Sequence, residues 1–67
     1  MLKKINEQNY FNQFISLVGR NIRLALRSTG EELEGTVTNA MFDSFLLQTK
    51  NAVKVITFDD LVYFEQV

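Results

Sequence analysis

Hydrophobic and polar residues follow two different periods along this chain, and the change comes at Gly19. Before Gly19, apolar residues recur every three or four positions, which is the period of a helix with one buried face. The residues of this stripe are Phe11, Phe14, Ile15 and Val18, with Tyr10 and Leu17 beside them. Asn6 suits the N-cap that begins a helix, and Gly19 suits the left-handed position that ends one. The pattern predicts a helix over residues 6–18.

After Gly19 the apolar residues alternate with a period of two, which is typical of β-strands. In the first such segment, Ile22, Leu24 and Leu26 alternate with Arg23, Ala25 and Arg27. Turn residues at 29–30, 50–52 and 59–61 separate the later segments. The pattern predicts five strands, over residues 21–28, 32–42, 45–49, 53–58 and 62–66.

Gly35 lies inside the second predicted strand, where glycine is costly unless the backbone bends or another segment approaches closely. A bend at this position fits a small barrel. We therefore predict a mainly β fold in a single domain over residues 1–67. It consists of an N-terminal α-helix followed by a five-stranded, strongly bent antiparallel sheet.

The small size of the chain makes its core marginal. A chain of 67 residues buries roughly 60% of the surface of its unfolded form. Small domains recover stability through disulfides, a metal or association with other chains. The sequence has no Cys and no His, which excludes disulfides and argues against zinc. Association is the remaining route, and we expect it here.

The residue types also argue against catalysis. Nucleophilic catalysis needs a nucleophile beside a base, and the common arrangements use His or Cys. We interpret Asp59 and Asp60 as a solvated turn rather than as ligands of a divalent ion or a glycosidase pair. Glycines at 19, 30 and 35 do not form a phosphate-binding loop. We expect no enzyme activity, no cofactor, no metal site and no small-molecule substrate.

Charge and hydropathy restrict the kinds of partner that we expect. The net charge of −1 lacks the basic excess typical of nucleic-acid-binding domains. Apolar runs are too short to span a membrane, and no charged segment followed by an apolar run marks a signal peptide. We expect no membrane partner and a cytoplasmic location, and the chain is compatible with a bacterial or a viral source.

The last two predicted strands are apolar on both faces, and such strands are usually covered on both faces. In a barrel this small, a neighbouring subunit is the expected cover. The predicted interface residues are Val55, Ile56, Val62, Tyr63 and Phe64.

Several segments together make the sequence resemble the Sm-like family, including its bacterial host-factor branch, Hfq. Gly30, Gly35 and Val37 have the spacing of the first family motif, and residues 55–64 resemble the second, in which a strand passes through a short turn into the last strand. Further matching segments are Ile22–Leu26, Phe42-Asp43 and Leu46-Leu47. The resemblance covers about residues 8–66, and small SH3-like barrels share much of it.

The resemblance implies a homo-oligomeric ring, commonly of about six or seven subunits, in which the fifth strand of one subunit pairs with the fourth strand of the next. For this chain we expect a ring of about five to seven subunits. It also implies binding of single-stranded RNA, often rich in uridine, by the loops after the second and fourth strands. There an aromatic residue stacks on a base, a polar residue reads the base edge, and a basic residue assists. The residues at these places are Phe42, Asp43, Ser44, Lys54, Phe58 and Asp59.

The chain departs from the family at this pocket. Counted from Gly30 without gaps, the expected Asp falls on Met41, and a shift of two residues is needed to align Phe42-Asp43 instead. The basic signature of the second motif is replaced by Phe58-Asp59, and an Asp at that place repels phosphate.

Two functions therefore stay open. The first is an Sm-like ring that binds single-stranded RNA, with a role in RNA metabolism or post-transcriptional regulation. Ring symmetry would then gather Arg23, Arg27, Lys50 and Lys54 into basic patches. The second is a small SH3-like barrel that serves as a protein-assembly or adaptor module without nucleic acid, in which Phe42 and Phe58 belong to the core or an interface.

Overall fold

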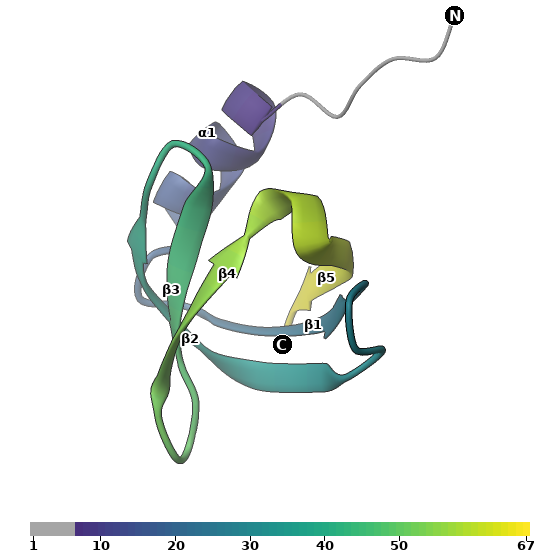
Figure 1. The fold of residues 1–67 in the computed structure, drawn as a ribbon. Coiled ribbons are helices and arrows are strands. Elements are labelled where there is room, and N and C mark those ends of the chain that lie inside the picture. The colour runs from purple at the N-terminus through teal and green to yellow at the C-terminus, as the bar shows by residue number, and fades with distance from the viewer. Residues whose placement is uncertain (1–6) are drawn as a thin grey trace, which may run out of the picture.

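The computed structural model describes residues 7–67, in which one helix precedes five strands (Figure 1). The elements are α1 (Glu7–Leu17), β1 (Asn21–Leu26), β2 (Glu32–Ala40), β3 (Ser44–Gln48), β4 (Val53–Thr57), the 3-10 helix η1 (Phe58–Asp60) and β5 (Leu61–Gln66). This order confirms the predicted fold class. The predicted N-cap, Asn6, lies outside the described residues. No helix within residues 7–67 has both the length and the apolar content needed to cross a bilayer.

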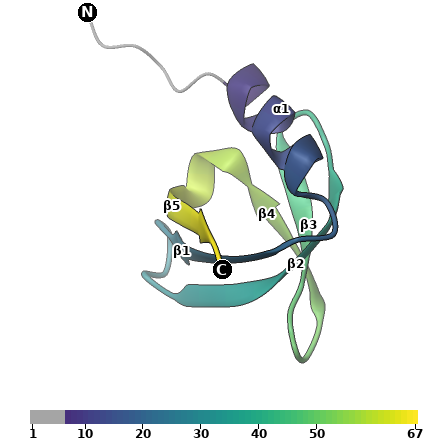
Figure 2. The same ribbon diagram turned by 180° about the vertical axis from the view of Figure 1, so that it is seen from behind.

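The five strands form one sheet in the order β4-β3-β2-β1-β5, and all neighbouring strands are antiparallel. The pairing shifts register between Val37 and Asn39 in β2, and between Ala25 and Leu26 in β1. Such irregularities increase the local bend and twist of a strand. The sheet curls accordingly, and α1 lies across one end of it (Figure 2). Because the sheet does not close on itself, β4 and β5 remain its two edges.

The glycines mark the places where the backbone needs them. Gly19, after α1, and Gly30, before β2, have φ angles of 89° and 74°, in the left-handed region that favours glycine. Gly35 serves a different purpose, because β3 passes close to it. A Cβ atom at Gly35 would overlap the carbonyl oxygen of Gln48 and lie 3.2 Å from Cγ of Leu47. Close approach of two strands thus accounts for the glycine inside β2.

An aromatic cluster joins α1 to the sheet. The ring of Phe14 stacks on Phe45 with a centroid distance of 4.3 Å and lies 4.7 Å from Phe64 and 5.4 Å from Phe58. The core around this cluster consists of Phe14, Ile22, Leu24, Leu26, Val37, Phe45, Leu47, Ile56, Phe58 and Leu61. The core therefore lies between α1 and the concave face of the sheet.

The buried face of α1 differs from the predicted stripe. Ile15 and Val18 are 50% and 44% exposed, whereas Tyr10, Phe11 and Leu17 pack with Phe14 against the core. The helical period is the one predicted, but the prediction that Ile15 and Val18 are buried is wrong. The contacts of Phe14 with Phe45 and Phe64 turn the helix so that these two residues point away from the sheet.

Candidate interaction surfaces

The predicted interface residues divide into two groups. Val55, Val62 and Tyr63 are exposed, at 65%, 56% and 41%. Ile56 is 5% exposed and belongs to the core, and Phe64 packs partly against the core. Ile56 therefore has little exposed surface with which to contact a neighbouring subunit. Its pairing with Phe45 in β3 places its side chain on the concave face.

At the open edge of β4, the unpaired backbone N–H and C=O groups belong to residues with exposed side chains. At either end of the β3–β4 pair, the N–H of Phe58 donates to the carbonyl of Asp43, and the N–H of Thr49 donates to the carbonyl of Ala52. Hydrogen-bonded and non-hydrogen-bonded pairs alternate in an antiparallel ladder. This alternation directs the backbone groups of Val53, Val55 and Thr57 away from β3. Unpaired groups of this kind are a template for another strand.

The open edge of β5 has the opposite arrangement. The N–H of Val67 donates to the carbonyl of Asn21, and the same alternation then pairs Glu65 and Tyr63 with β1. The backbone groups of Phe64 and Gln66 consequently face away from β1. Phe64 carries its side chain on the concave face, where its ring meets Phe14. The free backbone groups of β5 therefore belong to residues on the concave face, and those of β4 to residues on the convex face.

A groove with a volume of about 360 Å³ lies between α1 and β5. Its lining residues are Gln13, Ser16 and Leu17 from α1 and Phe64, Glu65 and Gln66 from β5. The groove thus borders the open edge of β5 on its concave side.

Two of the predicted RNA-binding residues, Phe42 and Asp43, lie at the surface of the β2–β3 turn, beside α1. Phe42 is 61% exposed, and its ring lies 6.1 Å from that of Phe11. Asp43 is exposed, whereas Ser44 is buried and its hydroxyl donates to Oδ1 of Asp43 at 3.1 Å. An exposed aromatic ring with a carboxylate next to it is a platform on which a flat apolar group can stack.

The other predicted RNA-binding residues do not complete this platform. Phe58 is fully buried between Tyr10, Phe14 and Phe45, so its ring is not available for stacking. Asp59 is exposed and directly follows Phe58 in the neighbouring turn. Lys54 lies four residues before Phe58, about 13 Å along the strand at the usual rise, and pairs with Leu47 instead. The structure therefore brings Phe42, Asp43 and Ser44 together without a basic residue of β4.

A hydrogen-bonded latch holds η1 against the β1–β2 turn. The carboxylate of Asp60 accepts hydrogen bonds from the N–H and the hydroxyl of Ser28, both at 2.8 Å. The guanidinium of Arg27 donates to the carbonyls of Asp59 and Leu61. Asp60 is therefore a structural residue of the turn, and Arg27 is already engaged.

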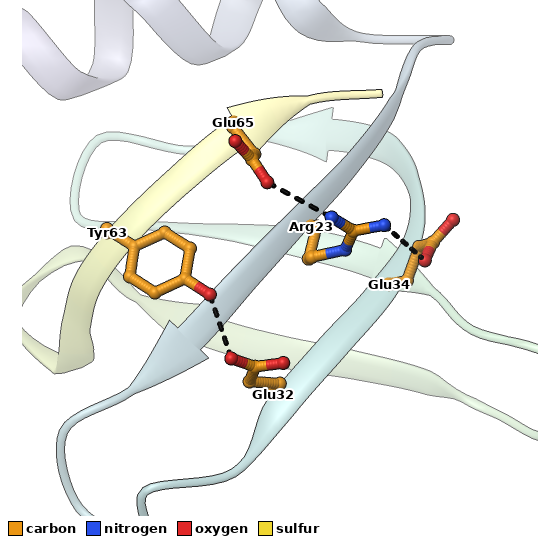
Figure 3. A network of polar contacts seen from close by, with 5 residues as sticks. All are labelled: Arg23, Glu32, Glu34, Tyr63 and Glu65. Carbon is orange, nitrogen blue, oxygen red and sulfur yellow. Dashed lines mark hydrogen bonds and ion pairs between the residues drawn. The ribbon is translucent and has the colours of Figure 1, made fainter.

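A polar network crosses the convex face of β5, β1 and β2 (Figure 3). Arg23 forms ion pairs with Glu65 at 3.1 Å and with Glu34 at 3.6 Å, and the hydroxyl of Tyr63 donates to Glu32 at 3.0 Å. The hydrogen bond to Glu32, with a smaller contribution from desolvation, raises the pKa of Tyr63 above 10.0. The sequence predicted none of these contacts, because they depend on the return of β5 beside β1.

Within residues 7–67, two of the five basic side chains are already engaged by other groups of the chain. Arg23 lies between two glutamates and Arg27 binds carbonyl groups, whereas Arg20, Lys50 and Lys54 form no ion pair with another described side chain. Within residues 7–67 no three Asp or Glu side chains gather as ligands for a metal ion.

Comparison with models of known protein families gives no match, and comparison with curated protein sequences gives no significant similarity. The resemblance to the Sm-like family therefore stays a prediction made from the residues of this chain.

Proposed function

We propose that this protein is an Sm-like, self-assembling barrel, whose subunits join edge to edge into a closed ring of about five to seven copies. The observation that carries this proposal is the pair of open edges. β4 and β5 both present unpaired backbone groups, and Val53, Val55 and Val62 next to them are more than half exposed. Joining β4 of each subunit to β5 of the next removes every edge and covers these side chains.

Single-stranded RNA is the ligand that we propose first for the ring. Support comes from Phe42, whose ring is exposed at the turn where the family resemblance expects a base-stacking residue. Stacking of a base on an aromatic ring contributes about 1–3 kcal/mol. Lys50 and Lys54, which form no ion pair with another described side chain, would be repeated around the ring and would attract phosphate through their summed field.

The second candidate is an assembly or adaptor module that binds no nucleic acid. The observation in its favour is the charge around the β4–β5 turn. Asp59 is exposed where the family carries a basic residue, and the nearest arginine, Arg27, is held by carbonyl groups. A ring without a cation beside Phe42 would favour a protein ligand over a polyanion.

The mass in solution, measured by light scattering on a sizing column, tests the ring. A mass of five to seven chains is the expected result, and a monomer at every concentration would contradict the proposal. Titration of labelled oligo-U and oligo-A, with Phe42→Ala as the variant, then separates the two candidates. Weaker RNA binding by a Phe42→Ala protein of unchanged mass supports the RNA function, and absence of binding by the unaltered ring supports the adaptor.

A further inference from the structure

The two open edges of the sheet differ in the face to which their residues belong. At β4, the residues with free backbone groups are Val53, Val55 and Thr57, which point their side chains to the convex face. At β5, the corresponding residues are Phe64 and Gln66, with Phe64 on the concave face. This difference determines which residues lie opposite each other when the two edges pair.

Antiparallel strands place directly opposite side chains on the same face of a sheet. If β4 of one copy pairs with β5 of another, the outward residues of the two strands must lie opposite each other. Matching the two sets along their whole length puts Val55 opposite Phe64 and Val53 opposite Gln66. Val53 and Val55 then lie on the concave side of the second copy, beneath its α1.

The structure has an empty space at that place. The groove between α1 and β5 borders the edge of β5 and includes Phe64, Gln66 and Leu17 in its lining. Its volume of about 360 Å³ accommodates valine side chains. Val55 is 65% exposed and Val53 is 53% exposed, so both lack a partner in the isolated subunit. The match in strand pairing and in face, with Leu17 and Phe64 as apolar contacts in the groove, points to one occupant.

We infer that the groove between α1 and β5 is the socket for Val55, and beside it Val53, of a second copy of this chain. This inference rests on the proposed edge-to-edge assembly and adds a role for α1, which forms one wall of the subunit interface. The helix then restricts the pairing of β4 and β5 to the register in which the valines enter the groove. Pairing through the backbone alone would leave several registers of similar stability.

Crosslinking provides a direct test, because the chain contains no cysteine. Gln13 lines the groove, and Ile15 is exposed about 200° away around the helix at 100° per residue. The variant with Gln13→Cys and Val55→Cys should give a ladder of linked chains with a short bismaleimide, whereas Ile15→Cys with Val55→Cys should give single chains. Equal crosslinking of the two variants in an assembly of normal mass would overturn the inference but leave the ring. A monomeric parent protein would overturn both.

A bulky residue in the groove is the second test. Ser16 lines the groove at the surface, whereas Ile15 is 50% exposed on another face of α1 and is not part of the lining. Ser16→Trp should weaken association by about tenfold or more, equivalent to a loss of about 1.4 kcal/mol, while the circular dichroism spectrum is retained. Ile15→Trp should associate like the parent. Unchanged association of the Ser16→Trp protein would show that only the strand edges meet and would overturn the inference.

Discussion

Gly35 lies where β2 passes close to β3. The atom that any other residue would add there overlaps the carbonyl oxygen of Gln48, which is backbone and cannot move aside alone. We expect Gly35→Ala to lower the free energy of unfolding by about 1–3 kcal/mol, the usual cost of forced overpacking. Urea unfolding followed by circular dichroism measures the change.

Gly30→Asn is the matched control for this prediction. Nothing lies within 4 Å of a Cβ at Gly30, and Asn tolerates the left-handed backbone found there. Its loss of stability should be clearly smaller. An equal loss in the two variants would contradict the close approach of β3 as the reason for glycine at position 35.

Tyr63, on the convex face, should make the stability of the fold depend on pH. Its pKa is raised chiefly by the hydrogen bond to Glu32, so the folded chain holds the phenol proton more tightly than the unfolded chain does. The resulting stabilisation is complete below pH 10, the ordinary pKa of tyrosine, and is lost as the pH rises through the pKa of the folded state. We expect the stability difference between the parent and Tyr63→Phe to shrink above that pH.

Two measurements check the pH prediction. Urea unfolding of the parent and of Tyr63→Phe on either side of pH 10 gives the stability difference. Phenolate absorbance in the Tyr10→Phe variant, which retains only Tyr63, gives the titration midpoint directly. A midpoint equal to that of free tyrosine would contradict the role of Glu32.

At the scale of elements, the latch between η1 and the β1–β2 turn determines where β5 begins. Asp60 accepts two hydrogen bonds from Ser28, and the N–H of Arg27 donates to the carbonyl of Asp60. We expect Asp60→Ala to cost about 1 kcal/mol or more, because each hydrogen bond to a charged group contributes on that scale. Thermal unfolding measures the loss.

Asp59→Ala is the control for the latch, because the carboxylate of Asp59 has no hydrogen bond to a described residue. Its melting temperature should stay close to that of the parent. Hydrogen exchange should also quicken at Ser28 in Asp60→Ala alone. If the two variants have the same melting temperature, the hydrogen bonds of Asp60 contribute nothing to stability.

The sequence predicted the existence and order of the elements because the change from helical to alternating period is strong. It placed the ends of the strands less well. The second predicted strand extends to residue 42, but β2 ends at Ala40, and Phe42 and Asp43 belong to the turn. The buried face of α1 was also misplaced, since Ile15 and Phe14 fit the same period and only packing against Phe45 distinguishes them.

The candidate sites show the same division. Val55 and Ile56 are adjacent aliphatic residues, and the sequence assigned both to an interface. The register of β4 against β3 places Ile56 in the core and Val55 at the surface. Phe42 and Phe58 were likewise grouped as aromatics of one pocket, but Phe58 begins η1 beneath α1 and is fully buried. Which face a residue occupies depends on register and on the helix that covers the sheet, and neither follows from local pattern.

At the scale of the whole molecule, the two edges are complementary rather than alike. β4 presents convex-face residues, and β5 presents concave-face residues beside a groove. A contact between unlike surfaces of identical chains is heterologous, and it closes into a ring when the rotation between subunits permits. A two-fold dimer through β4 alone would leave β5 and the groove uncovered. The asymmetry of the edges therefore supports the proposed ring over a two-fold dimer.

Introducing an aspartate at two neighbouring positions of β4 should affect assembly in one case and folding in the other. Val55 is 65% exposed in the subunit, so the Val55→Asp protein should fold. It should remain monomeric, because a carboxylate buried in the subunit interface would lose its hydration without gaining a partner. Ile56 is 5% exposed in the core, so Ile56→Asp should lose about 3 kcal/mol or more and unfold this small domain. Circular dichroism and light scattering on both variants give the two readouts. A Val55→Asp protein with the mass of the parent would exclude β4 from the subunit interface. A folded Ile56→Asp protein would contradict the register that places this residue in the core.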